Sequence, residues 1–368
     1  MSPMVRVLIV CALMFSGVAI APAAQARVPE SFFGAMWDRE ATVAPEPEQD
    51  AQWALMAKSG VKTVRTVFRW SQAQSSAGQP FDFAETDALM ARAARHEIKL
   101  LPLVLITPSW AARVPGEYGS PPKRASDYTA YLRALVGRYG PAGSFWLERP
   151  DLPRRPQREW QIWNEPHLDF YWNTEGRRRT AWAPEYARLL KASKRVIDAA
   201  DPGATVVLAG LADFAWDHFE RLNRSKIGRH FDVAALNFFT SRPRLLIKGI
   251  YRFRQALRRG GAGGKPIWVT ETTWPAGKKR VPVPDPLWQR AWYTSDRGMA
   301  RRVRGAYRLA ARFASRLGIG RVYWYTWSSA YRDSDLFDYA GLVRYRGGTF
   351  LPRPALAAYA DMARRLGP

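Results

Sequence analysis

Cysteine and histidine are scarce in this chain of 368 residues, and their scarcity excludes several kinds of site. The only cysteine is Cys11, which lies inside an apolar run near the amino terminus. Disulfides, cysteine nucleophiles and thiolate metal sites are therefore not expected in the rest of the chain. The four histidines are scattered without the spacing of metal ligands, so we expect no metal and no other cofactor.

Acidic residues are also few, with 32 Asp and Glu against 56 Lys and Arg, which gives a formal net charge of +24. The arginines are spread along the whole chain, whereas nucleic-acid-binding proteins concentrate positive charge on one face or tail. Within Met299–Leu317, apolar residues fall on one helical face and arginines mostly on the other. We therefore interpret the charge as a basic solvated surface and expect no nucleic-acid partner. Affinity for anionic glycans, wall polymers or membrane surfaces is the alternative.

Residues 1–26 have the pattern of a secretory signal peptide. Met1–Arg6 carries a positive charge, Val7–Ala21 is apolar but short for a membrane span, and Ala24-Gln25-Ala26 fits the small-x-small cleavage rule. We expect cleavage after Ala26, a mature domain of residues 27–368 without stable membrane insertion, and a secreted or cell-envelope location. A retained amino-terminal anchor is the alternative.

Short apolar runs alternate with longer helical stretches, as in α/β folds with a parallel sheet. Several runs, such as 100–106, are apolar nearly throughout, which is typical of strands buried on both faces. Strands are expected at Phe32–Trp37, Thr63–Phe68, Lys99–Ile106, Glu159–Trp163, Thr205–Ala209, Val233–Phe239, Ile267–Thr270 and Arg321–Thr326. Helices are expected at Ala51–Ser59, Glu85–Arg95, Tyr128–Tyr139, Pro184–Ala199 and Arg242–Arg259, with a long loop at Pro141–Pro156 and a flexible link at Gly260–Gly264.

Eight strand–helix units can close into a barrel or lie open as a doubly wound sheet. An open sheet that binds a dinucleotide needs a glycine-rich turn after its first strand. The corresponding turn here is Asp38-Arg39-Glu40-Ala41-Thr42 and contains no glycine. We therefore predict a single-domain (β/α)8 TIM barrel, a fold that accommodates chains of about 200 to 400 residues.

Two glutamates follow expected strands on opposite sides of this barrel. Glu165 lies in Trp163-Asn164-Glu165-Pro166 after the fourth strand, and Glu271 lies in Val269-Thr270-Glu271 after the seventh. Catalytic residues of TIM barrels lie at the carboxyl ends of the strands, so both side chains can converge at the mouth. Cleavage of glycosidic bonds requires such a pair of carboxyl groups, whose separation distinguishes retaining from inverting enzymes.

These motifs resemble the signatures of clan A retaining glycoside hydrolases, which include cellulase-like, β-xylosidase-like and α-L-iduronidase-like members. The resemblance covers essentially the whole mature chain. It implies that Glu165 is the acid/base, Glu271 is the nucleophile and Asn164 binds the sugar 2-hydroxyl. Arg65, on the second strand, would support the nucleophile. Further residues are expected to bind a carbohydrate substrate, with Trp327 as the floor under the sugar: Trp70, Trp110, His167, Asn237, Trp274 and Trp327.

The sixth strand departs from the clan pattern. The clan often has a His followed by a Tyr that hydrogen-bonds to the nucleophile, whereas this chain has Asn237-Phe238. An amide can donate a hydrogen bond and a phenyl ring cannot. A catalytically lapsed barrel that binds carbohydrate or the cell wall is therefore the alternative to a glycosidase. A transglycosylase would use the same residues, and the basic surface favours an acidic glycan as substrate.

Overall fold

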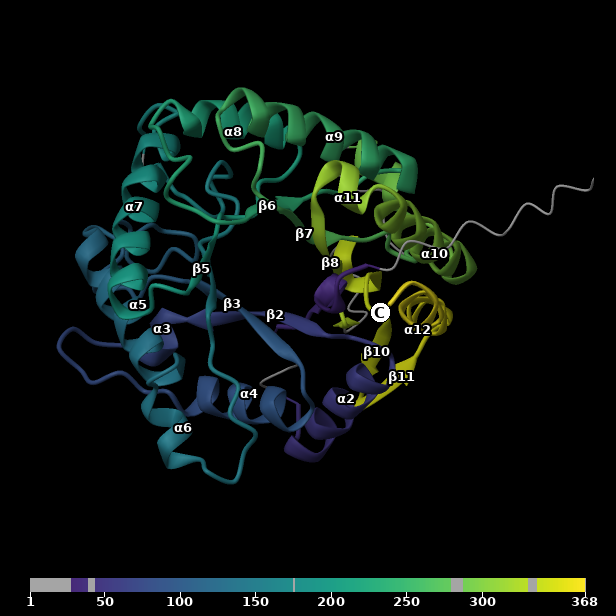
Figure 1. The fold of residues 1–368 in the computed structure, drawn as a ribbon, viewed down its shortest axis with the longest axis horizontal. Coiled ribbons are helices and arrows are strands. Elements are labelled where there is room, and N and C mark those ends of the chain that lie inside the picture. Colours follow the sequence, from purple (N-terminus) through teal and green to yellow (C-terminus); the bar gives the residue numbers. More distant parts are fainter. Residues whose placement is uncertain (1–27, 39–43, 175, 279–286, 330–335, 368) are drawn as a thin grey trace, which may run out of the picture.

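The computed structural model describes residues 28–38, 44–174, 176–278, 287–329 and 336–367. The expected signal peptide therefore lies outside the described residues. Within them, strands occupy the centre of the molecule and helices form an outer ring, as seen in Figure 1. None of the helices in these ranges is long and apolar enough to cross a membrane.

Eight parallel strands form the central sheet of the described chain, in the order β5-β4-β3-β2-β1-β8-β7-β6. The two edge strands are joined by the parallel bridges Val207↔Val233 and Leu211↔Leu236, which close the sheet into a barrel. The TIM barrel predicted from the sequence is therefore confirmed. The strands are β1 (Phe33–Met36), β2 (Thr63–Arg69), β3 (Lys99–Leu105), β4 (Glu159–Ile162), β5 (Thr205–Val207), β6 (Ala234–Asn237), β7 (Ile267–Thr272) and β8 (Ile319–Tyr325).

Each expected helix is present, and the arginine-rich stretch at 299–317 is divided between α10 and α11. The α-helices are α2 (Glu46–Lys58), α3 (Trp70–Ala73), α4 (Ala84–Arg95), α5 (Ala125–Tyr139), α6 (Ser144–Glu148), α7 (Trp182–Ala200), α8 (Ala215–Asn223), α9 (Pro243–Arg259), α10 (Asp296–Arg312), α11 (Ala314–Leu317) and α12 (Pro354–Leu366). Three 3-10 turns and a small sheet complete the described elements: η1 (Glu30–Phe32), η2 (Leu287–Trp292), η3 (Leu336–Tyr339), β9 (Ser328–Ser329), β10 (Val343–Arg346) and β11 (Thr349–Pro352).

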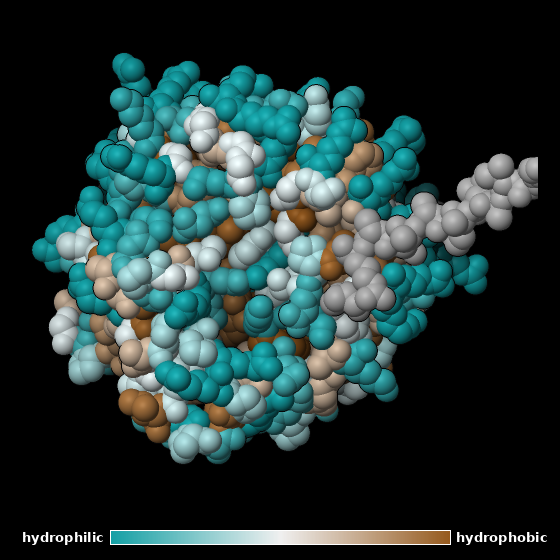
Figure 2. Space-filling model, viewed as in Figure 1, coloured by the Kyte–Doolittle hydropathy of each residue, from teal (hydrophilic) through white to brown (hydrophobic). Residues whose placement is uncertain are grey.

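Helix α6 corrects the expectation of a continuous loop at Pro141–Pro156. Its Phe145 and Trp146 side chains are buried, and the Trp146 indole donates to the carbonyl of Tyr139 at 2.9 Å. Burial of two aromatic rings stabilises this short helix, although proline and glycine flank it. At the lower left of Figure 2, where α6 lies, hydrophobic residues stand among hydrophilic ones at the surface, and Leu147 of α6 is exposed.

A polar cluster lies inside the barrel near the amino-terminal ends of the strands. Arg321 of β8 forms a bidentate ion pair with Glu159 of β4, at 2.5 and 2.6 Å. The guanidinium also lies 3.8 Å from the centre of the Trp268 ring and donates to the Tyr323 hydroxyl at 3.3 Å. Because β4 and β8 lie on opposite sides of the barrel, this ion pair connects strands that share no backbone hydrogen bonds.

Removing the acidic partner is expected to destabilise the barrel. Glu159→Gln leaves the buried Arg321 guanidinium without its counter-ion, so we expect the free energy of unfolding to fall by about 3 kcal/mol. Urea unfolding followed by circular dichroism measures this change. As a control, Asp151→Asn breaks an exposed ion pair with Arg149 and should leave the midpoint nearly unchanged. Equal midpoints for all three proteins would contradict the structural role of the Arg321–Glu159 pair.

Candidate active site

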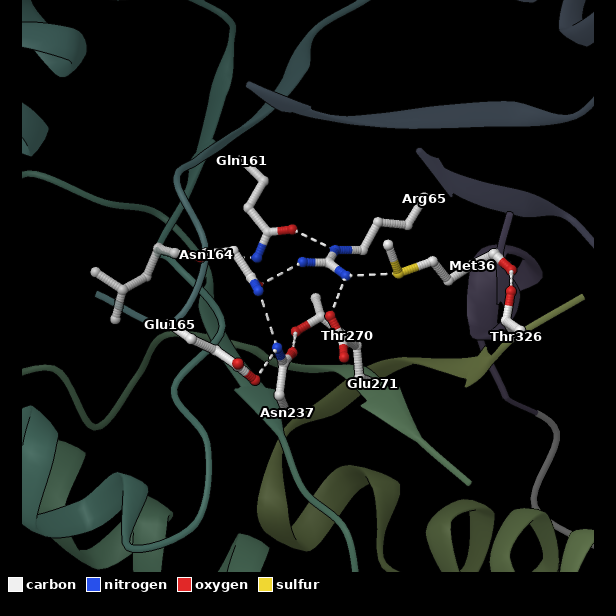
Figure 3. A network of polar contacts seen from close by, with 10 residues as sticks. Met36, Arg65, Gln161, Asn164, Glu165, Asn237, Thr270, Glu271 and Thr326 are labelled. Carbon is white, nitrogen blue, oxygen red and sulfur yellow. Dashed lines mark hydrogen bonds and ion pairs between the residues drawn. The ribbon is translucent and has the colours of Figure 1, made fainter. Parts of the chain in front are cut away.

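The backbone at the end of β4 turns sharply and presents two polar side chains to the barrel interior. Trp163 and Glu165 both adopt left-handed conformations, with φ of 68° and 39°. Such conformations cost about 1–3 kcal/mol each in residues other than glycine, so the surrounding structure must hold them. Asn164 forms a parallel bridge with Gly210, and the Glu165 amide donates to the Gly210 carbonyl at 3.1 Å. These contacts turn the Asn164 and Glu165 side chains towards β6, as Figure 3 shows.

Arg65 of β2 lies at the centre of the polar network in Figure 3. Its side chain is fully buried and donates from Nη1 to Glu271 Oε1 at 2.6 Å. Nε donates to Gln161 Oε1 at 2.6 Å, and Nη2 donates to Asn164 Oδ1 at 2.9 Å. A further contact joins Nη1 to the Met36 sulfur at 3.0 Å. With all three nitrogens engaged, the guanidinium fixes the positions of the Glu271 carboxyl group and the Asn164 amide.

Asn237 connects the two glutamates. A register shift in β6 places it opposite Glu271 of β7. Its Nδ2 donates to Glu165 Oε1 at 2.8 Å and to Asn164 Oδ1 at 3.1 Å, while its Oδ1 accepts a hydrogen bond from Thr270 at 2.7 Å. Asn237, which the sequence leaves able to donate on this strand while Phe238 cannot, therefore donates to Glu165. Because Asn164 Oδ1 is occupied twice, the Asn164 NH2 group is the part of this amide left for a ligand.

The two carboxyl groups differ in their electrostatic surroundings, although each glutamate is only 7% exposed. Burial and the negative charge of Glu271 raise the pKa of Glu165 to about 8, against the opposing effects of Asn237 and Arg65. Burial also raises the pKa of Glu271, but its direct ion pair with Arg65 opposes this rise. Among the described residues no cation contacts Glu165. The charge of Arg65 therefore favours the ionised form of Glu271, whereas the surroundings of Glu165 favour its protonated form.

Sequence reasoning missed four polar residues of the site. Gln161 binds Arg65 and donates to the carbonyl of Leu208 at 3.1 Å, which orients its amide. Asp213 contributes to the raised pKa of Glu165. Burial, followed by the charges of Glu165, Glu271 and Tyr325, raises the pKa of Tyr171. Only Gln161 carried a signal, because it is polar within an expected strand. The others lie in loops or at a strand end, where sequence periodicity gives no information.

His167 lies beside the site but forms no hydrogen bond from either ring nitrogen, both of which are buried. Its ring stacks on His218 with centroids 4.0 Å apart and packs edge-on against Trp182 at 6.0 Å. Burial, together with the neighbouring His218, holds the pKa of His167 well below its usual value. The imidazole of His167 is therefore held in its neutral form. The substrate contact predicted for His167 stays a prediction.

Three of the predicted substrate-binding tryptophans lie in the core instead. Trp70, Trp274 and Trp327 are each 0% exposed, so no ligand can contact their rings in this structure. The Trp327 indole donates to Gln52 at 3.0 Å, away from the glutamates. This burial corrects the expectation that Trp327 forms the floor under the sugar. Trp110 is partly exposed, and its indole donates to the carbonyl of Gln74 at 3.1 Å.

Gly210 makes room for the Asn237 amide, and this gives a test of the packing. A Cβ at position 210 would lie 2.3 Å from Asn237 Oδ1. We expect Gly210→Ala to lower the free energy of unfolding by about 1–3 kcal/mol, as overpacking does. In an Asn237→Ala background the same substitution should cost much less, because the conflicting amide is absent. Urea unfolding of the four proteins in the cycle measures the coupling.

Gly137 provides the control for this cycle. It lies in helix α5, and a Cβ there would meet no atom within 4 Å. Gly137→Ala should therefore leave stability unchanged or raise it by up to about 1 kcal/mol. Strictly additive penalties for Gly210→Ala and Asn237→Ala would contradict the proposed contact.

The fold is shared with solved glycosidase structures, although no protein-family model and no curated protein sequence matches the chain. A monomeric β-xylosidase from Caulobacter crescentus has 18% identity and a TM-score of 0.66, over 92% of this chain and 69% of that chain. A glucosidase from Croceicoccus marinus has 13% identity and a TM-score of 0.66, over 94% and 69%. A family 1 β-glucosidase from Thermotoga maritima has 11% identity and a TM-score of 0.63, over 93% and 100%. These matches confirm the (β/α)8 barrel, which this chain shares with solved glycosidases.

Proposed function

We propose that this protein is a retaining glycoside hydrolase with Glu165 as acid/base and Glu271 as nucleophile. One observation carries the proposal: two buried carboxyl groups share a network in which one is paired with Arg65 and the other holds its proton up to a pH of about 8. An ionised carboxylate beside a protonated carboxylic acid is the arrangement that glycosidic cleavage requires. The glycosidases that share this barrel are consistent with it.

The proposed reaction proceeds by two displacements. The Glu271 carboxylate attacks the anomeric carbon while Glu165 donates its proton to the departing glycosidic oxygen. In the second step, Glu165 accepts a proton from water, which attacks the same carbon and releases Glu271. The Asn164 NH2 group would donate to the 2-hydroxyl of the sugar. A transglycosylase would use the same steps with a sugar hydroxyl in place of water.

Retention is favoured because both carboxyl groups face one amide. Asn237 donates to Glu165 at 2.8 Å, and a hydrogen bond from the same side chain lowers the pKa of Glu271. Carboxyl groups on either side of a single NH2 group are closer to the roughly 5–5.5 Å of retaining enzymes than to the roughly 6.5–9.5 Å of inverting ones. The narrower spacing leaves no room for a water molecule between carboxylate and sugar.

Aromatic side chains near the glutamates support a substrate longer than one sugar. Phe170 is 63% exposed and Tyr118 is 44% exposed, and their rings stack with centroids 5.3 Å apart. Phe170 also packs at 4.9 Å against Tyr171, whose charge environment includes both glutamates. An apolar surface thus continues from the carboxyl groups to the solvent, and sugar rings stack readily on such surfaces.

The described surroundings of the glutamates favour a neutral glycan over an acidic one. Asp213 and Asp38 contribute negative charge near Glu165 and Glu271, respectively. Arg65, the cation that pairs with Glu271, is already engaged by Gln161 and Asn164 as well. A uronic acid bound here would therefore meet repulsion that Arg65, the cation paired with Glu271, is not free to offset. The acidic-glycan expectation rests on net charge alone, and we propose a neutral oligo- or polysaccharide instead.

Substitution of each glutamate tests the assignment. On a panel of neutral and uronic aryl glycosides, we expect turnover of a neutral substrate and a loss of about 100-fold or more in kcat/KM for Glu165→Gln and for Glu271→Gln. With a dinitrophenyl leaving group, which needs no proton, Glu165→Gln should retain its first step, and added azide should restore turnover. For Glu271→Gln, neither the dinitrophenyl leaving group nor added azide should restore turnover. Glu148→Gln, in an exposed ion pair with Arg138, is the matched control.

Two outcomes would contradict the proposal. If the wild-type protein cleaves no glycoside of the panel, and Glu271→Gln binds the same glycan with equal affinity, the barrel is a carbohydrate-binding protein that has lost catalysis. If the uronic substrates are turned over faster than the neutral ones at low salt, the neutral-glycan assignment is wrong while the reaction type stands.

The pH dependence of kcat/KM should show the raised pKa of Glu165. A general acid acts only while protonated, so kcat/KM is expected to fall as pH rises through about 8. The hydrogen bond from Asn237 lowers that pKa. Asn237→Ala should therefore move the alkaline limb to higher pH, whatever its effect on the maximum rate. An alkaline limb that stays fixed or moves to lower pH would contradict the role of this amide.

A further inference from the structure

One outer side of the barrel carries positive charge, and the only acidic residue of its helices is Asp296 at the start of α10. Helices α9 and α10 pack side by side, and α11 lies against α9. Neither residues 242–259 nor residues 297–317 contain an aspartate or glutamate. Over nearly their whole length, two neighbouring helices thus present one sign of charge.

Most exposed cations of this side form no ion pair with a described residue, although Arg259 at the end of α9 pairs with Glu220. Six of them lie on the outer faces of α9, α10 and α11: Arg244, Lys248, Arg304, Arg308, Arg312 and Arg316. Elsewhere on the barrel some exposed arginines pair with carboxylates, as Arg124 does with Asp127 and Arg365 does with Asp361. Unpaired cations at this density repel one another, so their positive charge is available to an external anionic partner.

An apolar groove lies between the same helices. It has a volume of about 360 Å³, with Ile247, Tyr251, Leu309, Phe313 and Leu317 along its walls and Arg244, Lys248 and Arg316 at its edges. Tyr251 is 47% exposed, and Leu245, on the same helix, is 37% exposed. Along this edge of the molecule Figure 2 shows hydrophilic residues with hydrophobic ones between them. We call this combination the α9–α10 groove.

We propose that the α9–α10 groove is a docking surface for an anionic phospholipid membrane. Cationic side chains would contact the lipid headgroups, while the groove accepts apolar parts of the lipid between them. Long arginine and lysine side chains suit this arrangement, because their apolar stems lie along the groove and their charged ends reach outward. Each basic residue at an anionic membrane surface contributes about fivefold to binding, so six together give a substantial affinity.

The apolar groove distinguishes a membrane from other anionic partners. Nucleic acids and acidic wall polymers would use the cations but leave Tyr251 and its apolar neighbours without a partner. An interfacial surface that combines basic and apolar side chains is typical of peripheral membrane binding. Binding of this kind needs no helix that crosses the bilayer.

The groove is separate from the candidate active site. Helix α9 connects β6 to β7 and α10 precedes β8, and both cover the outside of the barrel, whereas Glu165 and Glu271 lie inside it at the ends of β4 and β7. The side chains of the groove form none of the contacts that hold Arg65, Asn164 or Asn237. Membrane docking and glycoside cleavage can therefore be measured independently.

Vesicle flotation with the mature protein tests the proposal. We expect binding to phosphatidylglycerol/phosphatidylcholine vesicles, little binding to pure phosphatidylcholine, and weakening as salt is raised. Replacing Arg244, Lys248, Arg308 and Arg316 together by Gln should weaken binding by at least 100-fold. Tyr251→Gln, which keeps every charge, should weaken it several-fold. The matched control replaces four exposed arginines elsewhere by Gln, at Arg133, Arg188, Arg195 and Arg224, and should reduce binding far less.

Two results would overturn the proposal. Equal losses in the groove variant and the control variant would show an effect of net charge alone. Binding of a DNA duplex or an anionic polysaccharide that is lost in the groove variant, with no binding to the anionic vesicles, would assign the surface to another partner. All variants should cleave soluble aryl glycosides like the wild type, so failure of docking leaves the proposed glycosidase function untouched.

Discussion

The ion pair between Arg65 and Glu271 is the interaction on which the candidate site depends. A fully buried guanidinium requires compensation at each nitrogen, and the barrel supplies it from β1, β4 and β7. In satisfying Arg65, these strands also fix the carboxyl group and the amide that would contact a sugar. The contacts that compensate the buried charge of Arg65 are thus the same contacts that position the site. For this reason few loops are needed to hold the site.

The strained backbone at Trp163 and Glu165 complements this network from the opposite side. Glu165 has no cation of its own among the described residues and is held by the Asn237 amide and by the Gly210 carbonyl. One carboxyl group is therefore stabilised as an anion, and the other is held by neutral groups in a buried environment. The difference between two chemically identical side chains arises entirely from their neighbours.

The sequence was sufficient for the architecture and for the central residues of the site. Short runs that alternate with helical stretches predicted all eight barrel strands, and several runs are apolar nearly throughout, as is typical of strands buried on both faces. The short α6 helix was missed because proline and glycine dominate its flanks. The roles of Gln161 and Asn237 depend on register between strands, which no single sequence shows. Trp327 was misplaced for a different reason, because a tryptophan near a catalytic motif looks the same whether it faces a ligand or the core.

The barrel interior also contains two polar layers that do not touch. Arg321, Glu159 and Thr63 lie near the amino-terminal ends of the strands, and the Arg65 network lies near the carboxyl ends. An apolar layer that includes Leu101, Val207, Ala235 and Trp268 separates them. The contacts that hold the barrel together near the amino-terminal ends of its strands are thereby kept separate from the candidate catalytic residues at its mouth. A lineage can accumulate changes in one layer while the other stays intact, so this scaffold is suited to acquiring new substrate preferences, by natural drift or by directed evolution, without first losing its fold.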